Sequence, residues 1–513
     1  MSICEGLAVV FVCSDPAAAD AAITSAASTV VGAGARDHLR ASRQHEARSL
    51  LAAYRLGQSV YDDMLVSLSA TQQMRVRGAA DKAAIGEISL QLGFSRTKAG
   101  TWLHLGDALQ RLPKIRLAYL AGDVSTHRMS RMVYAAQLVP DDLVIDTDPT
   151  PGAACTLDFE DLALELQARP TTDTVLQDQL AEVVISLDPD GAAQTREQFA
   201  EVWQNLTVTA DSSGHMNLDG CVPAEDGVHL SQRISTLIAE RLCRRDPRRI
   251  GQQRVAALAE ITGVPGTTLT CHCGHHDCPQ RPTPNPTDPS DPSDPAGPSD
   301  PVYPSEPSDP SGHGTEAVSA DANVPEAEPN SQPPPSSSAW TLVLDPAGSV
   351  VPRLRGYGAI DPALAEALTE NSTLIAVPDT TERPPSGLIV VADRGPAPPV
   401  DPTGHGGHRH PPPGALTYTP SRRLRDQILH TDLWCRYPLC ATPSHDCELD
   451  HLVKFNHADP QAGGWTVPEN LAPLCTPDHH RKHLGIWLPT MHTDRTITWH
   501  NPTTREQMVT HPR

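Results

Sequence analysis

Side chains able to carry hydrolytic chemistry are concentrated near the C-terminal end of the sequence. In order they are an Asp-His pair (Asp450, His451), an asparagine (Asn470) and a His-x3-His (His479, His483). Hydrolysis of a phosphodiester needs an attacking water, a base that deprotonates it, and a cation that stabilises the charge on the phosphate and the leaving oxygen. Imidazole titrates near neutral pH, so His451 suits the role of base. The set predicts phosphodiester cleavage with one divalent metal.

The elements that contain these residues determine which side chains can share one ion. Neighbouring residues of an extended strand point in opposite directions, so Asp450 can hold a metal while His451 faces the water. Residues four apart on a helix share one face, so His479 and His483 can bind the same ion. We therefore expect a strand that carries the Asp-His pair and a helix that carries the His-x3-His.

A loop with two adjacent glycines separates these two elements. Gly463 and Gly464 have no side chains and permit a tight loop. The side-chain amide of Asn470 contains both donors and an acceptor, so it can tie this loop through hydrogen bonds to backbone groups. The sequence thus predicts an ordered connection between the strand and the helix.

This stretch resembles the HNH endonucleases, whose site is a ββα-metal finger of two strands and a helix. The resemblance is carried by WCRYPLC, CELDHLVKF, AGGWTVPENLAPLC and TPDHHRKHLG. It implies that His451 is the catalytic general base and that Asn470 organises the loop of the catalytic site. It also implies that Asp450, His479 and His483 bind a divalent metal, with Mg, Mn, Ni and Zn as the candidate ions.

The resemblance also implies a structural zinc held by cysteines, because many family members build such a site from two Cys pairs. Cys435 and Cys440 resemble the first pair, and Cys475 resembles the first member of the second. The family pattern places Cys or His three residues after Cys475, whereas this sequence has Asp478. A carboxylate oxygen can also bind zinc, so Asp478 is the expected fourth ligand. Two further residues are alternatives for that position: Cys447 and His445.

Composition and charge bound the rest of the chain. Its 513 residues leave room for roughly two to four domains. A net charge of −22 and an isoelectric point of about 5.4 argue against a protein that coats nucleic acid along its whole length. Residues 279–338 are rich in Asp-Pro-Ser units and nearly free of basic residues, which is typical of a disordered, extended linker.

Cysteine usage and the N-terminal residues indicate the compartment. Twelve cysteines in so long a chain do not form a disulfide scaffold, and their clustering favours metal binding in a reducing compartment. Residues 7–13 are apolar, but the stretch is too short and wrongly flanked for a signal peptide or a membrane span. It is predicted to be a short strand or the start of a helix. We expect a soluble, cytoplasmic protein with no membrane partner.

The N-terminal region has the pattern of helices. Residues 37–136 are rich in Ala and Leu, with apolar residues at helical spacing. Within residues 88–103, ISLQLGFSRTKAGTWL, Gly93 interrupts the pattern and Ser95 can cap a second helix. This segment resembles a helix-turn-helix, in which the start of the second helix faces DNA bases. Between the two interpretations, the sequence favours the plainer one, an αα-hairpin within a helical domain.

DNA is the expected partner, and several basic residues are candidates to contact it. Two lie at the start of the second helix of the helix-turn-helix-like segment, and the others give local positive charge near the finger that suits phosphate. The candidates are Arg96, Lys98, Arg422, Arg423, Arg481 and Lys482.

The remaining segments predict small α+β parts. Residues 214–242 predict a strand, a turn and a helix, residues 246–261 a further helix, and residues 340–368 a hairpin followed by a helix. The stretches EISLQLGFSRTKAGTWL, LAGDVS, VPAEDG and GYGAI resemble actinobacterial proteins that join a domain of unknown function, the 222 family, to a C-terminal HNH finger. The predicted domains are a helical accessory domain (1–278), a Pro/Asp/Ser-rich linker (279–338), a continuation of the accessory domain (339–395), a Gly/Pro/His-rich linker (396–414), the HNH nuclease domain (415–500) and a tail (501–513).

One more group of metal-binding residue types precedes the long linker, in TCHCGHHDCP. It contains Cys271, Cys273 and Cys278 with His272, His275 and His276. The spacings differ from the paired Cys-x2-Cys of a regular zinc finger. The sequence alone therefore favours an incidental or labile site here.

Together these features predict a metal-dependent DNA endonuclease. The expected fold is multidomain, with a mainly α N-terminal region, small α+β parts and a C-terminal zinc-stapled ββα-metal finger. One alternative is a DNA-binding zinc protein, made of the finger and the helix-turn-helix, without nuclease activity. Another is a structural or regulatory partner in which the finger is only a scaffold.

Overall fold

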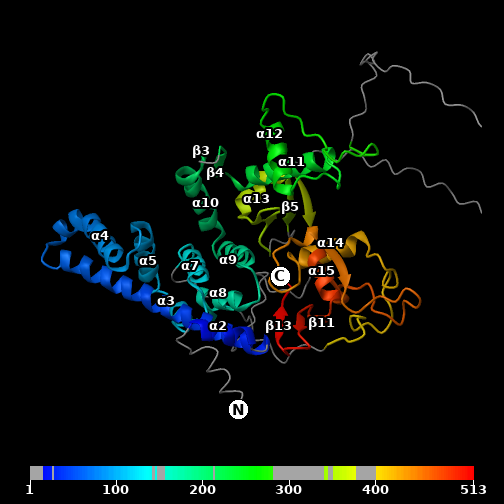
Figure 1. The fold of residues 1–513 in the computed structure, drawn as a ribbon, viewed down its shortest axis with the longest axis horizontal. Coiled ribbons are helices and arrows are strands. Elements are labelled where there is room, and N and C mark those ends of the chain that lie inside the picture. The colour runs from blue at the N-terminus through cyan, green and yellow to red at the C-terminus, as the bar shows by residue number, and fades with distance from the viewer. Residues whose placement is uncertain are drawn as a thin grey trace, which may run out of the picture. The chain divides into compact units, whose positions relative to one another are not determined.

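The structure is a computed structural model of the whole chain. It describes residues 16–25, 28–140, 145–146, 156–211, 214–280, 340–344, 350–376 and 400–512. The chain divides into two compact units (Figure 1): unit 1 contains Met1–Pro223 and Trp340–Arg513, and unit 2 contains Ala224–Ala339. Residues 224–278, predicted as part of the helical accessory domain, thus belong to unit 2.

Two sequence predictions concern residues that lie outside the described ones. These are the strand or helix start at residues 7–13 and the extended linker from residue 281 onward. Among the described helices, none has both the length and the apolar character required to cross a membrane.

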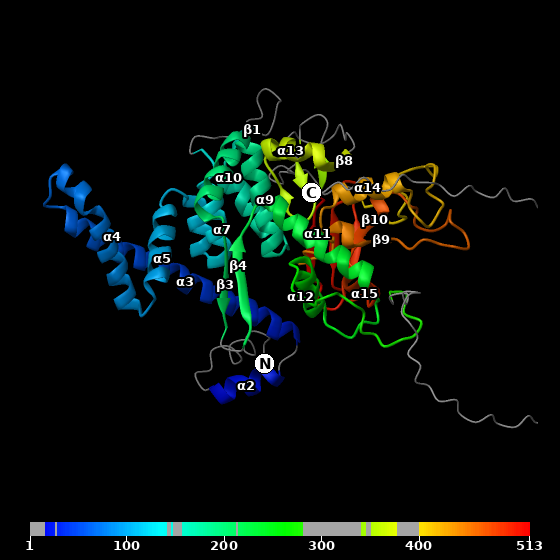
Figure 2. The ribbon, with the colours of Figure 1, turned by 90° about the horizontal axis from the view of Figure 1, so that it is seen from above.

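The N-terminal part of unit 1 is built from helices. The long helix α3 (Ser28–Leu65) packs along α4 (Ala70–Leu92) and α5 (Arg96–Ala108), as Figures 1 and 2 both show. The other helices of this part are α2 (Pro16–Ser25), α6 (Pro113–Leu120), α7 (Thr126–Ala136), α8 (Phe159–Ala168), α9 (Asp173–Leu187) and α10 (Pro189–Trp203). A single apolar core joins most of them, with Leu50, Ile88 and Leu176 fully buried. The prediction of a mainly helical N-terminal region is confirmed.

The turn between α4 and α5 follows the local signals of the sequence. Gly93 ends α4 in the left-handed conformation, with φ of 66°, which a residue with a side chain rarely adopts. Ser95 caps α5, because its hydroxyl oxygen accepts a hydrogen bond of 3.2 Å from the backbone N–H of Lys98. Ile88 and Ala99 on the two sides of the turn are buried. The two helices therefore form a packed αα pair.

Short strands interrupt and follow the helices. β1 (Ile145–Asp146) pairs with β2 (Thr156–Leu157), and after α10 a hairpin of β3 (Asn205–Ala210) and β4 (Met216–Cys221) completes the first segment of unit 1. The second segment begins with a sheet in the order β7-β6-β5-β8. The elements of this part of the second segment are, in order, β5 (Trp340–Leu344), β6 (Arg353–Leu354), β7 (Gly358–Ala359), α13 (Pro362–Leu368), η1 (Thr369–Asn371) and β8 (Ser372–Ala376). The predicted hairpin and helix are present, and β8 adds a strand parallel to β5.

A buried ion-pair group joins the two segments of unit 1. The guanidinium of Arg353 on β6 donates to Glu182 on α9 over 3.1 Å and also contacts Asp178 of the same helix. Asp178 accepts a further hydrogen bond of 3.2 Å from the backbone of Ala359. Because all three charged side chains are at most 10% exposed, removing one partner would leave a buried charge uncompensated.

The C-terminal part of unit 1 contains small sheets around short helices. In order it consists of α14 (Arg422–Thr431), η3 (Ser444–Asp446), β9 (Glu448–His451), η4 (Pro468–Asn470), β10 (Leu471–Leu474), α15 (Thr476–His483), β11 (Leu488–Met491), β12 (Ile497–His500) and β13 (Gln507–Thr510). β9 pairs with β10, and β11, β12 and β13 form an antiparallel meander. Buried cysteines, Ile497 and Trp499 share one core. Residues 501–513, predicted as a tail, thus provide β13, where Thr510 accepts a hydrogen bond from the Trp499 indole.

The predicted linker at residues 396–414 also packs on this part of the chain from residue 400 onward. The carbonyl of Gly404 accepts a hydrogen bond of 3.0 Å from the backbone of Trp465. The ring of His405 stacks on Trp465 with centroids 3.8 Å apart. These residues therefore extend the fold around the loop that precedes β10.

Unit 2 contains two helices within its described residues. α11 (Ala224–Arg241) packs against α12 (Ile250–Ile261), and an irregular segment follows as far as residue 280. Their small shared core contains Leu242, Ala257 and Leu269. The helices predicted for residues 214–242 and 246–261 are present.

The substitution Arg353→Ala tests the ion-pair group that joins the two segments. We expect it to lower the free energy of unfolding by about 3–5 kcal/mol, because Asp178 and Glu182 then remain buried without a counter-charge. Urea denaturation of the full chain measures the change. Arg422→Ala is the matched control, since that side chain is 89% exposed, and it should change stability by less than about 0.5 kcal/mol. Equal effects of both substitutions would contradict this interpretation.

Candidate metal and catalytic site

The pairing of β9 with β10 positions the Asp-His pair. Asp450 lies opposite Ala472 and His451 lies opposite Leu471 in the antiparallel register. β10 leads directly into α15, whose N-cap residue is Cys475. Asp450 therefore contacts α15, whereas His451 contacts the loop before β10. This is the opposite orientation of neighbours that the strand geometry requires.

The candidate site contains three side chains that lie close together: Asp450, His479 and His483. One ligand atom from each lies within 4.8 Å of the others. His479 Nε2 is 3.3 Å from Asp450 Oδ1 and 3.0 Å from His483 Nε2. The other ring nitrogen of His479, Nδ1, lies 3.1 Å from Glu448 Oε2. One carboxylate oxygen and two imidazole nitrogens form a donor set that suits a divalent transition metal and leaves coordination positions for substrate or water.

Two side chains that the sequence did not assign to this site orient its acidic and imidazole groups. Lys482 Nζ donates to Asp450 Oδ2 over 2.6 Å and to the His451 carbonyl over 2.8 Å. Its side chain is only 11% exposed, so the ammonium predicted to contact DNA is used inside the site. Glu448 is two residues before Asp450, so both lie on one face of β9. That alternation is the sequence signal that would have identified Glu448.

The tautomer of His451 follows from its hydrogen bonds. Its Nε2 lies 2.9 Å from Thr466 Oγ1, and the Thr466 hydroxyl donates its single hydrogen to the Thr417 carbonyl over 2.5 Å. Nε2 must therefore donate to Thr466, which leaves Nδ1 as the nitrogen with a lone pair in the neutral ring. Burial lowers the pKa of His451 to about 4, so the imidazole is neutral near pH 7. Tyr418 stacks on the ring with centroids 5.3 Å apart.

The amide of Asn470 ties the loop between the strand and the helix. Its Oδ1 accepts from the backbone N–H of Val453 over 2.8 Å, and its Nδ2 donates to the carbonyls of Val453 and Trp465 over 3.0 and 2.9 Å. A Cβ atom on Gly464 would lie 2.1 Å from the Val453 carbonyl oxygen. The glycine is therefore required for the close approach, and the amide holds it.

The four residues expected to bind structural zinc also lie together. Single ligand atoms of Cys435, Cys440, Cys475 and Asp478 fall within 4.8 Å of one another. Cys440 Sγ is 3.8 Å from Cys475 Sγ, and Asp478 Oδ2 is 3.1 Å from Cys475 Sγ. Thiolates bound to tetrahedral zinc at about 2.3 Å have sulfurs roughly 3.8 Å apart, so the arrangement fits that ion.

The fourth position of this group is occupied by Asp478 in the structure. Its side chain is buried, and Arg481 donates to Oδ1 over 2.6 Å, which directs Oδ2 to the cysteines. Cys447 lies beside Cys435, but its thiol donates to the Pro443 carbonyl over 3.4 Å. His445, the other alternative, lies 3.7 Å from Asp446.

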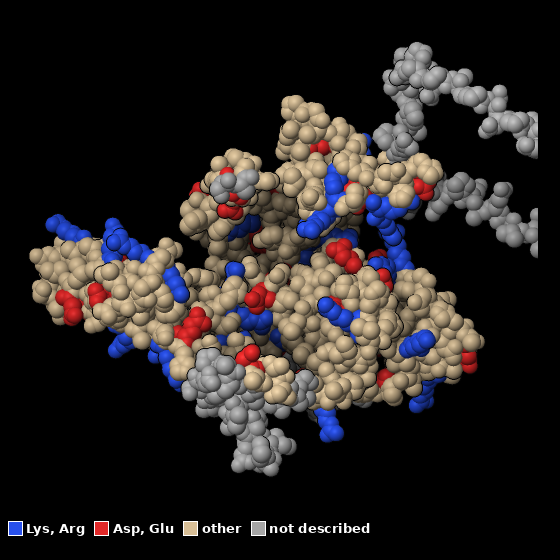
Figure 3. Space-filling view, in the orientation of Figure 1, with Lys and Arg blue, Asp and Glu red and all other residues tan. Residues whose placement is uncertain are grey.

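The remaining basic candidates are at the surface. Arg96, Arg422 and Arg423 are exposed. The Lys98 ammonium lies 4.0 Å from the centre of the Phe94 ring, a cation–π contact. On the face drawn in Figure 3, Lys and Arg are dispersed among Asp and Glu, in keeping with the acidic composition.

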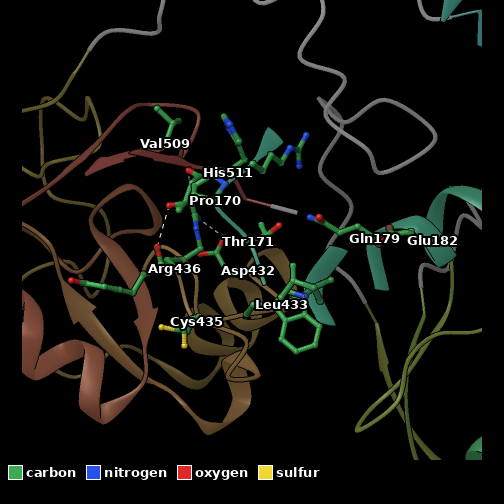
Figure 4. A pocket seen from close by; sticks show the side chains of 16 residues that line it. Pro170, Thr171, Gln179, Glu182, Asp432, Leu433, Cys435, Arg436, Val509 and His511 are labelled. Atoms are coloured by element: carbon green, nitrogen blue, oxygen red, sulfur yellow. Dashed lines mark hydrogen bonds and ion pairs between the residues drawn. The ribbon is translucent and has the colours of Figure 1, made fainter. Parts of the chain in front are cut away.

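A cavity of about 70 Å³ lies beside the group of Cys435, Cys440, Cys475 and Asp478 (Figure 4). Pro170, Asp432 and Cys435 are among the residues that line it, and the Pro170 carbonyl accepts a hydrogen bond of 2.9 Å from Leu439. Sites for small ligands usually enclose about 300 Å³ or more. This cavity is smaller than such sites and lies between the α8–α9 connection and the C-terminal part of unit 1.

Comparisons with known proteins give one family match, which covers part of unit 1 and part of unit 2. Residues 42–286 match the family model described as domain of unknown function (DUF222). The resemblance to the 222 family is thus confirmed for that part of the chain, and the HNH resemblance stays a prediction. The match extends from the middle of α3 through the cysteine-containing segment after α12.

The chain is similar to uncharacterized proteins of Mycobacterium tuberculosis. It is 28% identical to the protein Rv3776 over 448 residues, which cover 84% of this chain and 70% of the relative. It is 26% identical to Rv2100 over 442 residues, which cover 84% of this chain and 69% of that relative. No solved structure matches significantly.

The substitution Asn470→Ala tests the loop tie. We expect the free energy of unfolding to fall by on the order of 3 kcal/mol, because the peptide groups of Val453 and Trp465 lose their partners inside the protein. Urea denaturation followed by tryptophan fluorescence measures this. The control is Asn501→Ala, which removes two hydrogen bonds within a turn, to Thr503 and Thr504, and should cost less than about 1 kcal/mol. A smaller loss for Asn470→Ala than for the control would refute the tie.

The substitutions Asp478→Ala and Cys447→Ser distinguish Asp478 from Cys447 as the fourth zinc ligand. We expect Asp478→Ala to weaken zinc binding and lower the melting temperature, because a structural zinc contributes directly to folding energy. Cys447→Ser should keep its zinc, since that thiol bonds to the Pro443 carbonyl. Zinc content by elemental analysis and thermal melts of both variants provide the test. Zinc loss in Cys447→Ser but not in Asp478→Ala would show that Cys447 is the fourth ligand and that Asp478 is not.

Proposed function

We propose that this protein is a metal-dependent endonuclease that hydrolyses phosphodiester bonds in DNA. The observation that carries the proposal is the convergence of Asp450, His479 and His483 on a shared site, next to a neutral His451 on the same strand. The HNH-like order of these residues in the sequence supports the same reaction. The match to DUF222 does not indicate an activity, because the function of that domain is unknown and the similar mycobacterial proteins are uncharacterized.

The residues of the site fit the metal that this reaction requires. Asp450 Oδ1, His479 and His483 would hold it, with Glu448 and Lys482 fixing the ligand side chains. A divalent cation bound there supplies charge stabilisation for the phosphate oxygens and the leaving group. The cation-binding atoms lie on α15 and on one face of β9, so they approach a phosphate from one side.

His451 performs the proton transfer in this proposal. Its Nδ1 has the lone pair and takes a proton from the attacking water, while Thr466 holds the ring through Nε2. The negative charge of the neighbouring Asp450 favours the resulting imidazolium. It raises the pKa of His451 and so opposes the lowering by burial. Asn470 acts indirectly, because it fixes the loop that contains Thr466.

DNA is proposed to bind through exposed basic residues and not through the whole surface. Arg422 and Arg423 project from the start of α14, and Arg96 from the start of α5. Each can contact a phosphate, and such contacts make binding salt-dependent. Arg481 is exposed but pairs with Asp478, and the largely buried Lys482 pairs with Asp450. Removing them would therefore disturb metal sites as well as charge.

The substitution His451→Ala tests the proposed base in the full chain. We expect nicking of plasmid DNA, measured with Mg, Mn, Ni and Zn in turn, to fall about a hundredfold to ten-thousandfold. Metal binding by titration calorimetry and DNA binding should persist, because His451 does not belong to the metal-binding group. The matched control is His480→Ala, an exposed histidine beside His479 that is also outside that group, and it should nick DNA at the wild-type rate.

A companion variant separates loss of the base from loss of the metal. His479→Ala should lose both nicking and metal binding at this site, while the zinc held by the cysteines remains. Undiminished nicking by His451→Ala would refute its role as base. DNA binding by the wild-type chain without cleavage under any of the four metals would instead indicate a DNA-binding zinc protein.

A further inference from the structure

The cysteine-rich segment of unit 2 is completed by a residue from another part of the chain. Cys243 follows the end of α11, and its Sγ lies 3.5 Å from that of Cys271. The sulfurs of Cys243, Cys271, Cys273 and Cys278 all lie within 4.8 Å of one another. The sequence suggested three cysteines with three histidines, whereas the structure selects four cysteines. Cys243 was missed because it precedes the other three by a whole helix, α12.

Hydrogen bonds hold the two cysteine-bearing segments against each other. Asp246, three residues after Cys243, accepts from the backbone N–H of His272 over 2.9 Å. Arg248 pairs with Asp246 over 2.9 Å and donates to the Thr270 carbonyl over 2.7 Å. The Asp246 side chain is fully buried. These contacts fix the backbone on both sides of the sulfur group, so its geometry does not depend on the cysteines alone.

The local backbone also folds the last two cysteines toward the first. Gly274 adopts φ of 69°, a left-handed conformation that reverses the chain directly after Cys273. The backbone N–H of Cys278 then donates to the His275 carbonyl over 3.2 Å. This turn returns Cys278 to the group, whereas the histidines of the segment are exposed and lie outside the set of converging ligand atoms.

The small size of unit 2 is an independent reason to expect a cross-link, or staple, that stabilises its fold. Among the described residues 224–280, the buried apolar side chains are Val228, Leu242, Ala257 and Leu269. Cys271 packs against the cluster that Leu242, Ala257 and Leu269 form. A chain of this size usually needs a disulfide, a metal or a partner surface in addition to its core. The sulfur group is located where such a staple would join α11 to the segment after α12.

We propose that unit 2 contains a structural zinc ion bound by the four thiolates of Cys243, Cys271, Cys273 and Cys278. Four soft, converging thiolates select zinc in a closed tetrahedral site, where sulfurs lie roughly 3.8 Å apart. The observed separations fit this ion. The site has no open position, so its contribution is folding energy and not catalysis. It is separate from the cysteine–aspartate group near α15 and does not depend on the proposed nuclease activity.

Zinc content of purified full-length variants tests the proposal. Cys273→Ser and Cys278→Ser should each contain one zinc fewer per chain than the control Cys221→Ser, whose cysteine is exposed on β4. His275→Ala should keep the wild-type content, because its ring is outside the ligand group. Cys435→Ser should lose a different zinc, so the combination with Cys273→Ser should lose two. Unchanged zinc in Cys273→Ser and Cys278→Ser, or iron in place of zinc, would overturn the assignment.

A second measurement needs no variant, and so remains decisive if the serine variants do not fold. The native chain is alkylated with iodoacetamide, with and without a zinc chelator, and the labelled cysteines are mapped by mass spectrometry. We expect Cys243, Cys271, Cys273 and Cys278 to be protected until the chelator is added, while Cys221 reacts in both conditions. Equal labelling without the chelator, or recovery of these residues as disulfide-linked peptides, would refute the zinc site.

Discussion

The register between β9 and β10 is the constraint on which the candidate site depends. With His451 opposite Leu471, the carboxylate of Asp450 contacts α15 and the imidazole of His451 contacts Thr466. A slip of one residue would exchange the two faces of the strand and separate both side chains from their partners. Asn470 fixes this register, because its amide bonds to the loop immediately after β9 and before β10. The metal ligands and the candidate base are therefore positioned by one hairpin.

Buried ion pairs and cysteines hold together parts of unit 1 that a larger apolar core would hold together in other proteins. The C-terminal part of unit 1 has buried cysteines in its core, and Asp432 bonds to both Arg436 and Arg495. Arg436 also donates to the Thr510 carbonyl of β13, and Arg495 donates to the Leu471 carbonyl of β10. Buried ions of this kind add little net stability but penalise misfolded arrangements that leave them unpaired. Arg353 has the same role between the two segments of unit 1. The fold is thus specified by a few partners that must all be present together.

Sequence reasoning succeeded where the determining interactions are local. Gly93 and Ser95 define the end of one helix and the start of the next through contacts with residues a few positions away, so the α4–α5 turn was predictable. It was incomplete where partners are distant in the chain. Lys482 belongs to a basic run that suits DNA, yet its ammonium bonds to Asp450, which only the fold brings near. Cys243 was overlooked for the same reason, because its sulfur partners follow an intervening helix.

The insertion of unit 2 within unit 1 also sets an order of events during synthesis. Arg353 follows Glu182 and Asp178 by 171 and 175 residues, so a ribosome releases the two acids well before their counter-charge. At about 5–20 residues per second the delay is roughly ten to thirty-five seconds. During that interval α9 cannot reach its final buried state, whereas the segment from Cys243 to Cys278 is already complete. The inserted unit can therefore finish folding before the unit that surrounds it.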